Sequence, residues 1–128
     1  MKILMVDDEA DARILFAQRF RKEIANKELQ FAFAGSGHEA LGYLEDKDED
    51  IQIVLSDINM PGMSGLELLE KIKQRPVSSP TVMMISAYGD EENYKQSVRL
   101  GASDFLTKPV DFGILKQKLK SFIQQSGS

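Results

Sequence analysis

Five short and nearly continuous apolar segments recur along the 128-residue chain, and longer amphipathic stretches separate them. Uninterrupted apolar runs are typical of strands that are buried on both faces of a parallel sheet. Strands that alternate with helices in this way predict a doubly wound α/β domain, with right-handed crossovers and helices on both faces. The apolar segments are residues 3–6, 31–34, 51–55, 82–85 and 105–106.

Amphipathic stretches after the apolar segments predict the helices. In the first stretch, Leu15, Phe16, Phe20 and Ile24 recur at helical spacing, which indicates a helix with one apolar face. The stretch 92–100 has a thin apolar face, formed by Tyr94, Val98 and Leu100. A helix that buries little is weakly held, so we expect this helix and its flanks to be the mobile part of the domain. The other predicted helices cover 39–44, 66–72 and 111–124, with Ser64 and Asp111 as N-caps.

Composition narrows the class of protein. The net charge of −4 argues against DNA or an anionic membrane as the main partner, because both attract basic surfaces. No cysteine and one histidine are present, so disulfides are excluded and a structural zinc site is disfavoured. No segment resembles a signal peptide or a membrane span, and we expect a cytoplasmic protein. We predict one domain over residues 1–125, and a tail or the start of a linker at 126–128.

Polar residues of a few chemical types follow four of the predicted strands. Because the carboxyl ends of parallel strands meet at one edge of a sheet, and ligands bind there, these residues mark the expected site. They are Asp7, Asp8 and Glu9 after the first strand, Asp57 and Asn59 after the third, Ser86 after the fourth and Lys108 after the fifth.

These residues predict a phosphoryl-acceptor site. Two carboxylates about 4 Å apart repel by about 4 kcal/mol at an effective dielectric constant near 20, so the cluster needs positive charge. Lys108 supplies one charge, and a divalent cation supplies more. Oxygen ligands without sulfur or imidazole favour Mg²⁺ or Mn²⁺ over Zn²⁺. A carboxylate beside a metal, an ammonium group and a hydroxyl is suited to attack phosphorus and to neutralise the charge on the transferred group.

Each of these residues alone has an ordinary structural interpretation. An aspartate at a strand end usually caps a helix, and Asp11 is either such a cap or a first-turn charge. Ser86 alone would be a turn residue, and Lys108 alone a solvated charge. The combination of four suitable groups at four strand ends favours a site.

Four motifs together resemble the receiver domain of two-component response regulators, over residues 2 to about 125. In length the chain is similar to single-domain chemotaxis regulators. The resemblance implies a flavodoxin-like (βα)5 fold with five parallel strands in the order 2-1-3-4-5. The motifs are Val6-Asp7-Asp8-Glu9, Ser56-Asp57-Ile58-Asn59-Met60-Pro61-Gly62-Met63-Ser64-Gly65, Ile85-Ser86-Ala87 and Gly101-Ala102-Ser103-Asp104-Phe105-Leu106-Thr107-Lys108-Pro109.

The resemblance also implies the metal ligands and the acceptor. Asp57 matches the phosphoacceptor and one ligand of Mg²⁺, for which Mn²⁺ can substitute. Asp8 matches the direct ligand, Asp7 acts largely through a metal-bound water, and Asn59 offers its backbone carbonyl. Pro61 and the glycines that follow it make this loop tight and let the backbone approach a ligand.

The remaining matched residues form the expected switch. Ser86 matches the hydroxyl that turns toward the phosphoryl group, and Lys108, before a cis Pro109, matches the phosphate-binding lysine. Phe105 matches the switch aromatic that swings inward, although a plain core aromatic is the alternative. Because phenylalanine replaces the commoner tyrosine, its inward state rests on packing. Tyr88 is either a shield that slows hydrolysis or a surface aromatic.

The resemblance implies a phosphorylation switch rather than a conventional turnover enzyme. The expected partners are a sensor histidine kinase or a histidine phosphotransfer protein, and a downstream effector, with no nucleic acid or membrane bound directly. Three alternatives stay open. A haloacid-dehalogenase-type phosphatase needs an acid where Asn59 stands, and a flavin-binding module would meet repulsion from the acidic residues at 7–9. A phosphorylation-independent pseudo-receiver typically lacks Asp57 or Lys108.

Overall fold

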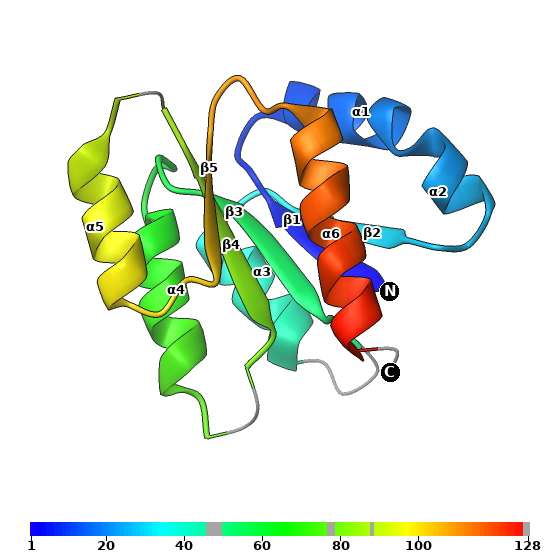
Figure 1. Ribbon diagram of the computed structural model, residues 1–128. Coiled ribbons are helices and arrows are strands. Elements are labelled where there is room, and N and C mark those ends of the chain that lie inside the picture. Colours follow the sequence, from blue (N-terminus) through cyan, green and yellow to red (C-terminus); the bar gives the residue numbers. More distant parts are fainter. Residues whose placement is uncertain (46–49, 77–78, 88, 127–128) are drawn as a thin grey trace.

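One parallel sheet organises the chain, as the computed structural model shows for residues 1–45, 50–76, 79–87 and 89–126. Its strand order is β2-β1-β3-β4-β5, so the predicted fold class and the predicted order are confirmed (Figure 1). The strands are β1 (Lys2–Val6), β2 (Gln30–Ala34), β3 (Ile53–Asp57), β4 (Thr81–Ser86) and β5 (Asp104–Thr107).

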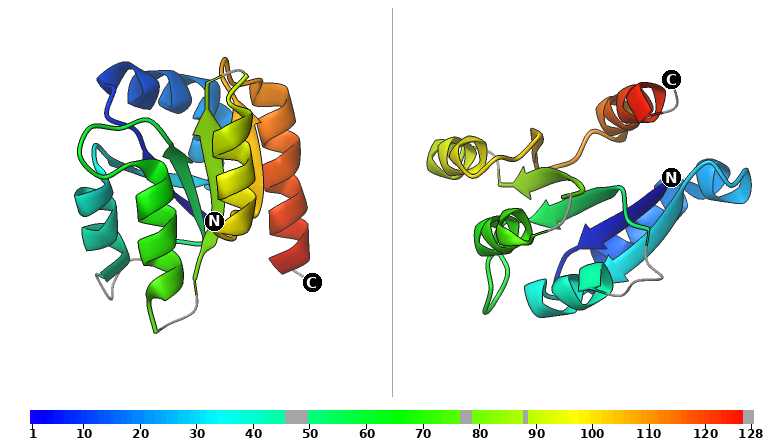
Figure 2. Two further views of the ribbon diagram at one scale, coloured as in Figure 1. Left: turned by 90° about the vertical axis from the view of Figure 1, so that its left-hand side faces the viewer. Right: turned by 90° about the horizontal axis from the view of Figure 1, so that it is seen from below.

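Helices cover both faces of the sheet. Figure 2 shows α1, α2 and α6 on one face, and α3, α4 and α5 on the other. This layering follows from parallel pairing, since each strand must be reached by a crossover that packs on the sheet. The helices are α1 (Ala10–Arg19), α2 (Arg21–Ala25), α3 (Gly37–Glu45), α4 (Gly65–Gln74), α5 (Glu91–Arg99) and α6 (Phe112–Ser126).

The two faces carry separate apolar cores, and β3 contributes to both. Val54 packs with the α3–α4 side, whereas Ile53 and Leu55 pack with the α1–α6 side. Every residue of β3 is buried. The nearly continuous apolar run in the sequence therefore reflects a central strand that is covered on both sides.

The first predicted helix is interrupted. The chain leaves helical geometry at Phe20 (φ −105°, ψ 18°), which separates α1 from α2. Phe16 and Phe20 are buried as predicted, but Leu15 is 40% and Ile24 37% exposed. A face read from Leu15 to Ile24 therefore combines residues of two helices. Phe20 packs with the ring of Phe31, at a centroid distance of 5.1 Å.

Helix ends mostly agree with the sequence. The Ser64 side chain accepts a hydrogen bond from the Glu67 N–H (3.2 Å), and Asp111 accepts one from the Ile114 N–H (3.1 Å). Asp11 lies in the first turn of α1 as a charge rather than as its cap. Helix α6 continues to Ser126, two residues beyond its predicted end, and the rest of the predicted tail lies outside the described residues.

The thin apolar face of α5 is confirmed. Tyr94 and Val98 are exposed, and Ser97 is the buried residue of this helix. The expected mobility of α5 stays a prediction. None of the helices within the described ranges has the length and apolar character needed to cross a membrane.

Candidate functional site

Strand register brings the predicted residues to one edge of the sheet. Strands β1, β3, β4 and β5 pair in parallel up to their last residues, so Asp7, Asp57 and Lys108 stand at the same end. The pairs next to this edge are Val6–Ser56, Asp57–Ile85 and Ser86–Thr107.

The sheet hydrogen bonds continue one residue past these strand ends. The Asp7 N–H donates to the Ala34 carbonyl (3.0 Å), and the Lys108 N–H donates to the Ser86 carbonyl (2.8 Å). The backbone of the site residues is therefore held by the sheet rather than by a free loop, which limits how far their side chains move.

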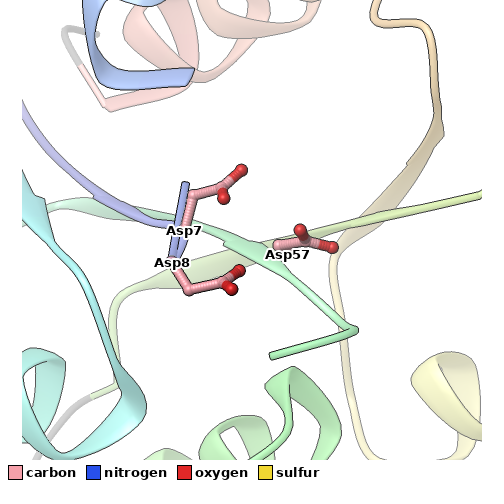
Figure 3. A group of neighbouring side chains, drawn as sticks. All are labelled: Asp7, Asp8 and Asp57. Carbon is pink, nitrogen blue, oxygen red and sulfur yellow. The ribbon is translucent and has the colours of Figure 1, made fainter. Parts of the chain in front are cut away.

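Three carboxylates gather at this edge. Each of Asp7, Asp8 and Asp57 offers an oxygen within 4.8 Å of the other two. Figure 3 shows the Asp7 and Asp8 carboxylates leaving the chain on the side that faces Asp57. Asp57 is only 4% exposed, whereas Asp7 is half-buried and Asp8 is exposed. Solvent exposure thus decreases from Asp8 through Asp7 to Asp57, which is the most buried of the three.

Lys108 is the counter-charge within this cluster. Its Nζ donates to Asp57 Oδ2 at 2.8 Å, and the bond between Lys108 and Pro109 is cis, as expected. Burial alone would lower the pKa of Lys108, but the hydrogen bond to Asp57 and the nearby negative charges outweigh it and raise this pKa. Lys108 therefore stays protonated and holds Asp57 at a fixed position.

Asp7 is costly to ionise in the folded protein, mainly because it is partly buried. Burial raises the pKa of this carboxyl group, and the charge of Asp57 raises it further. The N–H of Glu9, which donates to Asp7 Oδ1 at 2.9 Å, and the charge of Lys108 act in the opposite direction. Burial is the largest cause of the increase, and the negative charge of Asp57 adds to the cost of ionising Asp7.

Ser86 and Phe105 lie on adjacent strands and face the same core. Ser86 is fully buried, and its Oγ has no hydrogen-bond partner among the described residues. Alternation along β4 puts Ser86 on the same face as Met84, and Phe105 packs against the core that contains Met84. Leu106 packs on the opposite face, as predicted. The orphaned hydroxyl is thus available to a ligand at the edge. Tyr88 lies outside the described residues.

The loop between β3 and α4 carries Asn59. The Asn59 N–H donates to Asp57 Oδ1 (3.3 Å), and Gly62 adopts a left-handed conformation (φ +76°). Gly65 makes a close approach, but to the chain itself: a Cβ there would stand 2.2 Å from the Asp57 carbonyl oxygen. The glycine that we assigned to ligand approach instead lets α4 begin directly against the acceptor strand.

The residues at this edge suit a hard cation. Their donors are the oxygens of three carboxylates, whereas Lys108 supplies one positive charge. Mg²⁺ prefers such oxygen donors and needs few of them from the protein. All predicted metal ligands and Lys108 thus belong to one edge of the sheet.

A groove beside the site was not predicted. It has a volume of about 910 Å³, lies between α1 and residues 108–113, and is lined by Asp7 and Lys108 together with apolar Leu15 and Phe112. The helical spacing put Leu15 on the apolar face of the first predicted helix. It therefore gave no sign that this side chain is exposed and lines a groove. Gly37 and Met63, which contact each other below the site, were also missed.

The fold and the carboxylate cluster can now be compared with those of known protein families. A sequence model of the response regulator receiver domain matches residues 3–120. The chain therefore belongs to the response regulator receiver domain family, whose members are signalling switches of two-component phosphorelays rather than conventional enzymes.

Individual relatives agree with this membership. The chain is 39% identical to the response regulator protein PilR of Pseudomonas aeruginosa over 116 residues, which are 91% of this chain and 24% of that protein. It is 32% identical to the response regulator RppA of Synechocystis sp. over 126 residues, 98% of this chain and 52% of that protein. The chain thus spans about half or less of the length of these relatives.

Solved structures show the same fold. A CheY-like response regulator receiver domain protein from Methanospirillum hungatei superposes with a TM-score of 0.82 at 31% identity, covering 97% of this chain and 94% of that one. The receiver domain of NtrX from Brucella abortus gives 0.76 at 33% identity, covering 93% and 95%.

The burial of Asp7 and the like charge of Asp57 predict that Asp7→Asn stabilises the metal-free protein. Because the pKa of Asp7 is raised in the folded state, its ionised form destabilises folding above that pKa, and this penalty disappears as the pH falls through it. In urea unfolding with chelator at pH 7, the variant should gain about 1 kcal/mol, and the difference should shrink toward pH 4. Asp11→Asn, outside the cluster, is the control. Equal or lower stability of Asp7→Asn would contradict the repulsion.

Proposed function

We propose that this domain accepts a phosphoryl group on Asp57 from a phosphohistidine of a partner protein, and that the modified domain then controls an output partner. The observation that carries this proposal is the ion pair between Lys108 Nζ and Asp57 Oδ2 (2.8 Å) inside a cluster of two further carboxylates. A buried aspartate held by a lysine beside a cation site is the arrangement that acyl phosphate formation needs.

The transfer is an in-line displacement. An Asp57 carboxylate oxygen attacks phosphorus, the bond between phosphorus and the partner's imidazole nitrogen breaks, and its electron pair remains on the imidazole. The product is a mixed anhydride on Asp57. Lys108 already contacts this carboxylate, so it is placed to neutralise negative charge on the phosphoryl oxygens. The Ser86 hydroxyl, which lacks a partner among the described residues, is placed to donate to one of them.

The metal in this proposal is Mg²⁺, and Mn²⁺ substitutes for it. Asp8 holds it directly, Asp7 largely through a water molecule, and Asp57 and the Asn59 carbonyl complete the protein ligands. When bound, the ion neutralises charge on the carboxylates and on the transferred group. The cluster brings three carboxylates together with one lysine, and this formal excess of negative charge supports the proposal, since it favours binding of a cation.

Phosphorylation adds a charge of about −1.5 to −2 at Asp57. In the proposed switch, Ser86 turns toward this charge, and Phe105 moves into the space that Ser86 leaves. Both residues face the side of the sheet that α3, α4 and α5 cover, so the change is passed to α5 and β5, and α6, which follows β5 in the chain, completes the altered surface. The thin apolar face of α5 favours this route, because the helix buries little surface that would resist its displacement.

The partner that donates the phosphoryl group is a sensor histidine kinase or a histidine phosphotransfer protein. The groove between α1 and residues 108–113 supports docking at α1, because it joins apolar Leu15 to the site residues Asp7 and Lys108. In this proposal the protein is cytoplasmic, and its phosphorylated form acts on a downstream effector. Water later hydrolyses the acyl phosphate and resets the domain.

Replacement of the acceptor tests the proposal. Asp57→Asn removes the nucleophilic carboxylate while keeping its size, so labelling by radioactive acetyl phosphate in Mg²⁺ should fall to background. Asp11→Asn, which alters an aspartate outside the metal cluster, should be labelled like the unmodified protein. Circular dichroism should show that both variants keep the fold. Undiminished labelling of Asp57→Asn would exclude Asp57 as the acceptor.

The metal requirement is tested in the same assay. Excess chelator should abolish labelling of the unmodified protein, because the carboxylate cluster then repels the incoming phosphate. Addition of Mg²⁺ or Mn²⁺ above the chelator concentration should restore it. Labelling that continues at the same rate in chelator would contradict the assignment of a divalent ion.

A further inference from the structure

The loop that carries Asn59 is held at both ends by backbone hydrogen bonds. At its start, the Ile58 N–H donates to the Ile85 carbonyl (2.9 Å). At its end, the Gly65 N–H donates back to the Ile58 carbonyl (2.8 Å). The loop is therefore closed at its base, and its shape depends on what holds the residues between these two points.

Two methionines anchor the middle of this loop. Met60 is 8% and Met63 6% exposed, and both belong to the core under α3 and α4. Asn59 and Pro61, their neighbours, are exposed. Loop residues rarely bury large apolar side chains without a structural reason, so these two side chains set the position of the loop.

Met63 is seated against the first residue of α3. A Cβ at Gly37 would lie 2.5 Å from Met63 Sδ, 3.0 Å from its Cγ and 3.1 Å from its Cβ. Rotation of the methionine side chain can move Sδ and Cγ but cannot move Cβ, which is fixed to the loop backbone. The absence of a side chain at Gly37 is thus what allows the loop to stand where it does.

Another glycine of the same helix shows that the contact at Gly37 is specific. Gly42 also lies in α3, and a Cβ there would meet nothing within 4 Å. Alanine in place of glycine normally favours a helix, at either position. Gly42→Ala should therefore stabilise α3 without touching the loop, whereas Gly37→Ala must displace Met63.

We propose that Met63, seated on Gly37, is a positioning residue for the metal site: the contact fixes the loop that carries Asn59, whose carbonyl is a proposed ligand of Mg²⁺. This inference rests on the proposed function, since it takes Asn59 as a ligand. The loop is short and closed at its base, so a displacement at Met63 reaches Asn59, four residues earlier.

The test measures Mg²⁺ binding and the Met63 methyl group separately. Gly37→Ala should weaken Mg²⁺ binding, measured by isothermal titration calorimetry, by roughly tenfold, as expected when a group that orients a metal ligand is disturbed. In protein labelled with ¹³C at the methionine methyl groups, the Met63 resonance, assigned with Met63→Leu, should shift. Gly42→Ala is the matched control and should leave both the affinity and this resonance unchanged.

A second variant approaches the contact from the other side. Met63→Ala removes the anchor without adding a clash and should also weaken Mg²⁺ binding. The double variant Gly37→Ala/Met63→Ala adds a methyl group at position 37 and removes the side-chain atoms beyond Cβ at position 63. It should bind Mg²⁺ more tightly than the sum of the two single losses predicts, because the residues act through one contact.

The outcomes separate this inference from the proposed function. If the unmodified protein binds no Mg²⁺, the metal assignment and this inference both fail. If the unmodified protein binds Mg²⁺, but Gly37→Ala and Met63→Ala bind it equally well, only the positioning role fails. Losses that add independently in the double variant, or an equal loss in Gly42→Ala, would also overturn it.

Discussion

Crowding of like charge at one edge of the sheet is the constraint on which the rest of the structure depends. Parallel pairing up to the strand ends forces Asp7, Asp8 and Asp57 together, with oxygens within 4.8 Å of one another. Lys108, 2.8 Å from Asp57, balances one of these three charges, and the charge of Asp57 adds to the effect of burial in raising the pKa of Asp7. A site with excess negative charge, fixed by the sheet, has its groups in place before a cation or a phosphoryl group arrives. Such preorganisation avoids rearrangement at the moment of reaction.

The two cores beside the sheet serve different purposes in the proposed function. On one face, the rings of Phe16, Phe20 and Phe112 pack together and hold α1 and α6 in place, with the 16–112 centroids 5.1 Å apart. On the other face, Ser86 and Phe105 share a core with the loop methionines and lie next to α5, which buries little. In the proposed function, the phosphoryl donor docks beside α1 on the first face, and the change at Asp57 is passed to α5 on the other face, a helix whose buried residue is Ser97.

Much of this arrangement could be predicted from the sequence, because it depends on local patterns. Uninterrupted apolar runs marked the strands, and the polar residues after them marked the site, since all parallel strands end at one edge. The break at Phe20 could not be predicted, because the helical spacing of apolar residues continues through it, whereas Phe20 packs on rings that are distant in the sequence, among them Phe31. The contact between Gly37 and Met63 joins segments that are distant in sequence. A glycine at a helix start has many ordinary explanations, so no local pattern singled this one out.

Chemical trapping of the acyl phosphate tests most directly whether these groups converge to hold a phosphoryl group. The unmodified protein, phosphorylated with acetyl phosphate in Mg²⁺, is treated with borohydride, which reduces an aspartyl phosphate to homoserine, and its peptides are sequenced by mass spectrometry. We predict homoserine at position 57, and none at Asp7 or Asp8, although all three carboxylates lie within reach of the same ion. Homoserine at either of these two positions would contradict the assignment of Asp57 as the residue that lysine and metal activate together. An unmodified Asp57 in protein that has been phosphorylated would contradict it as well.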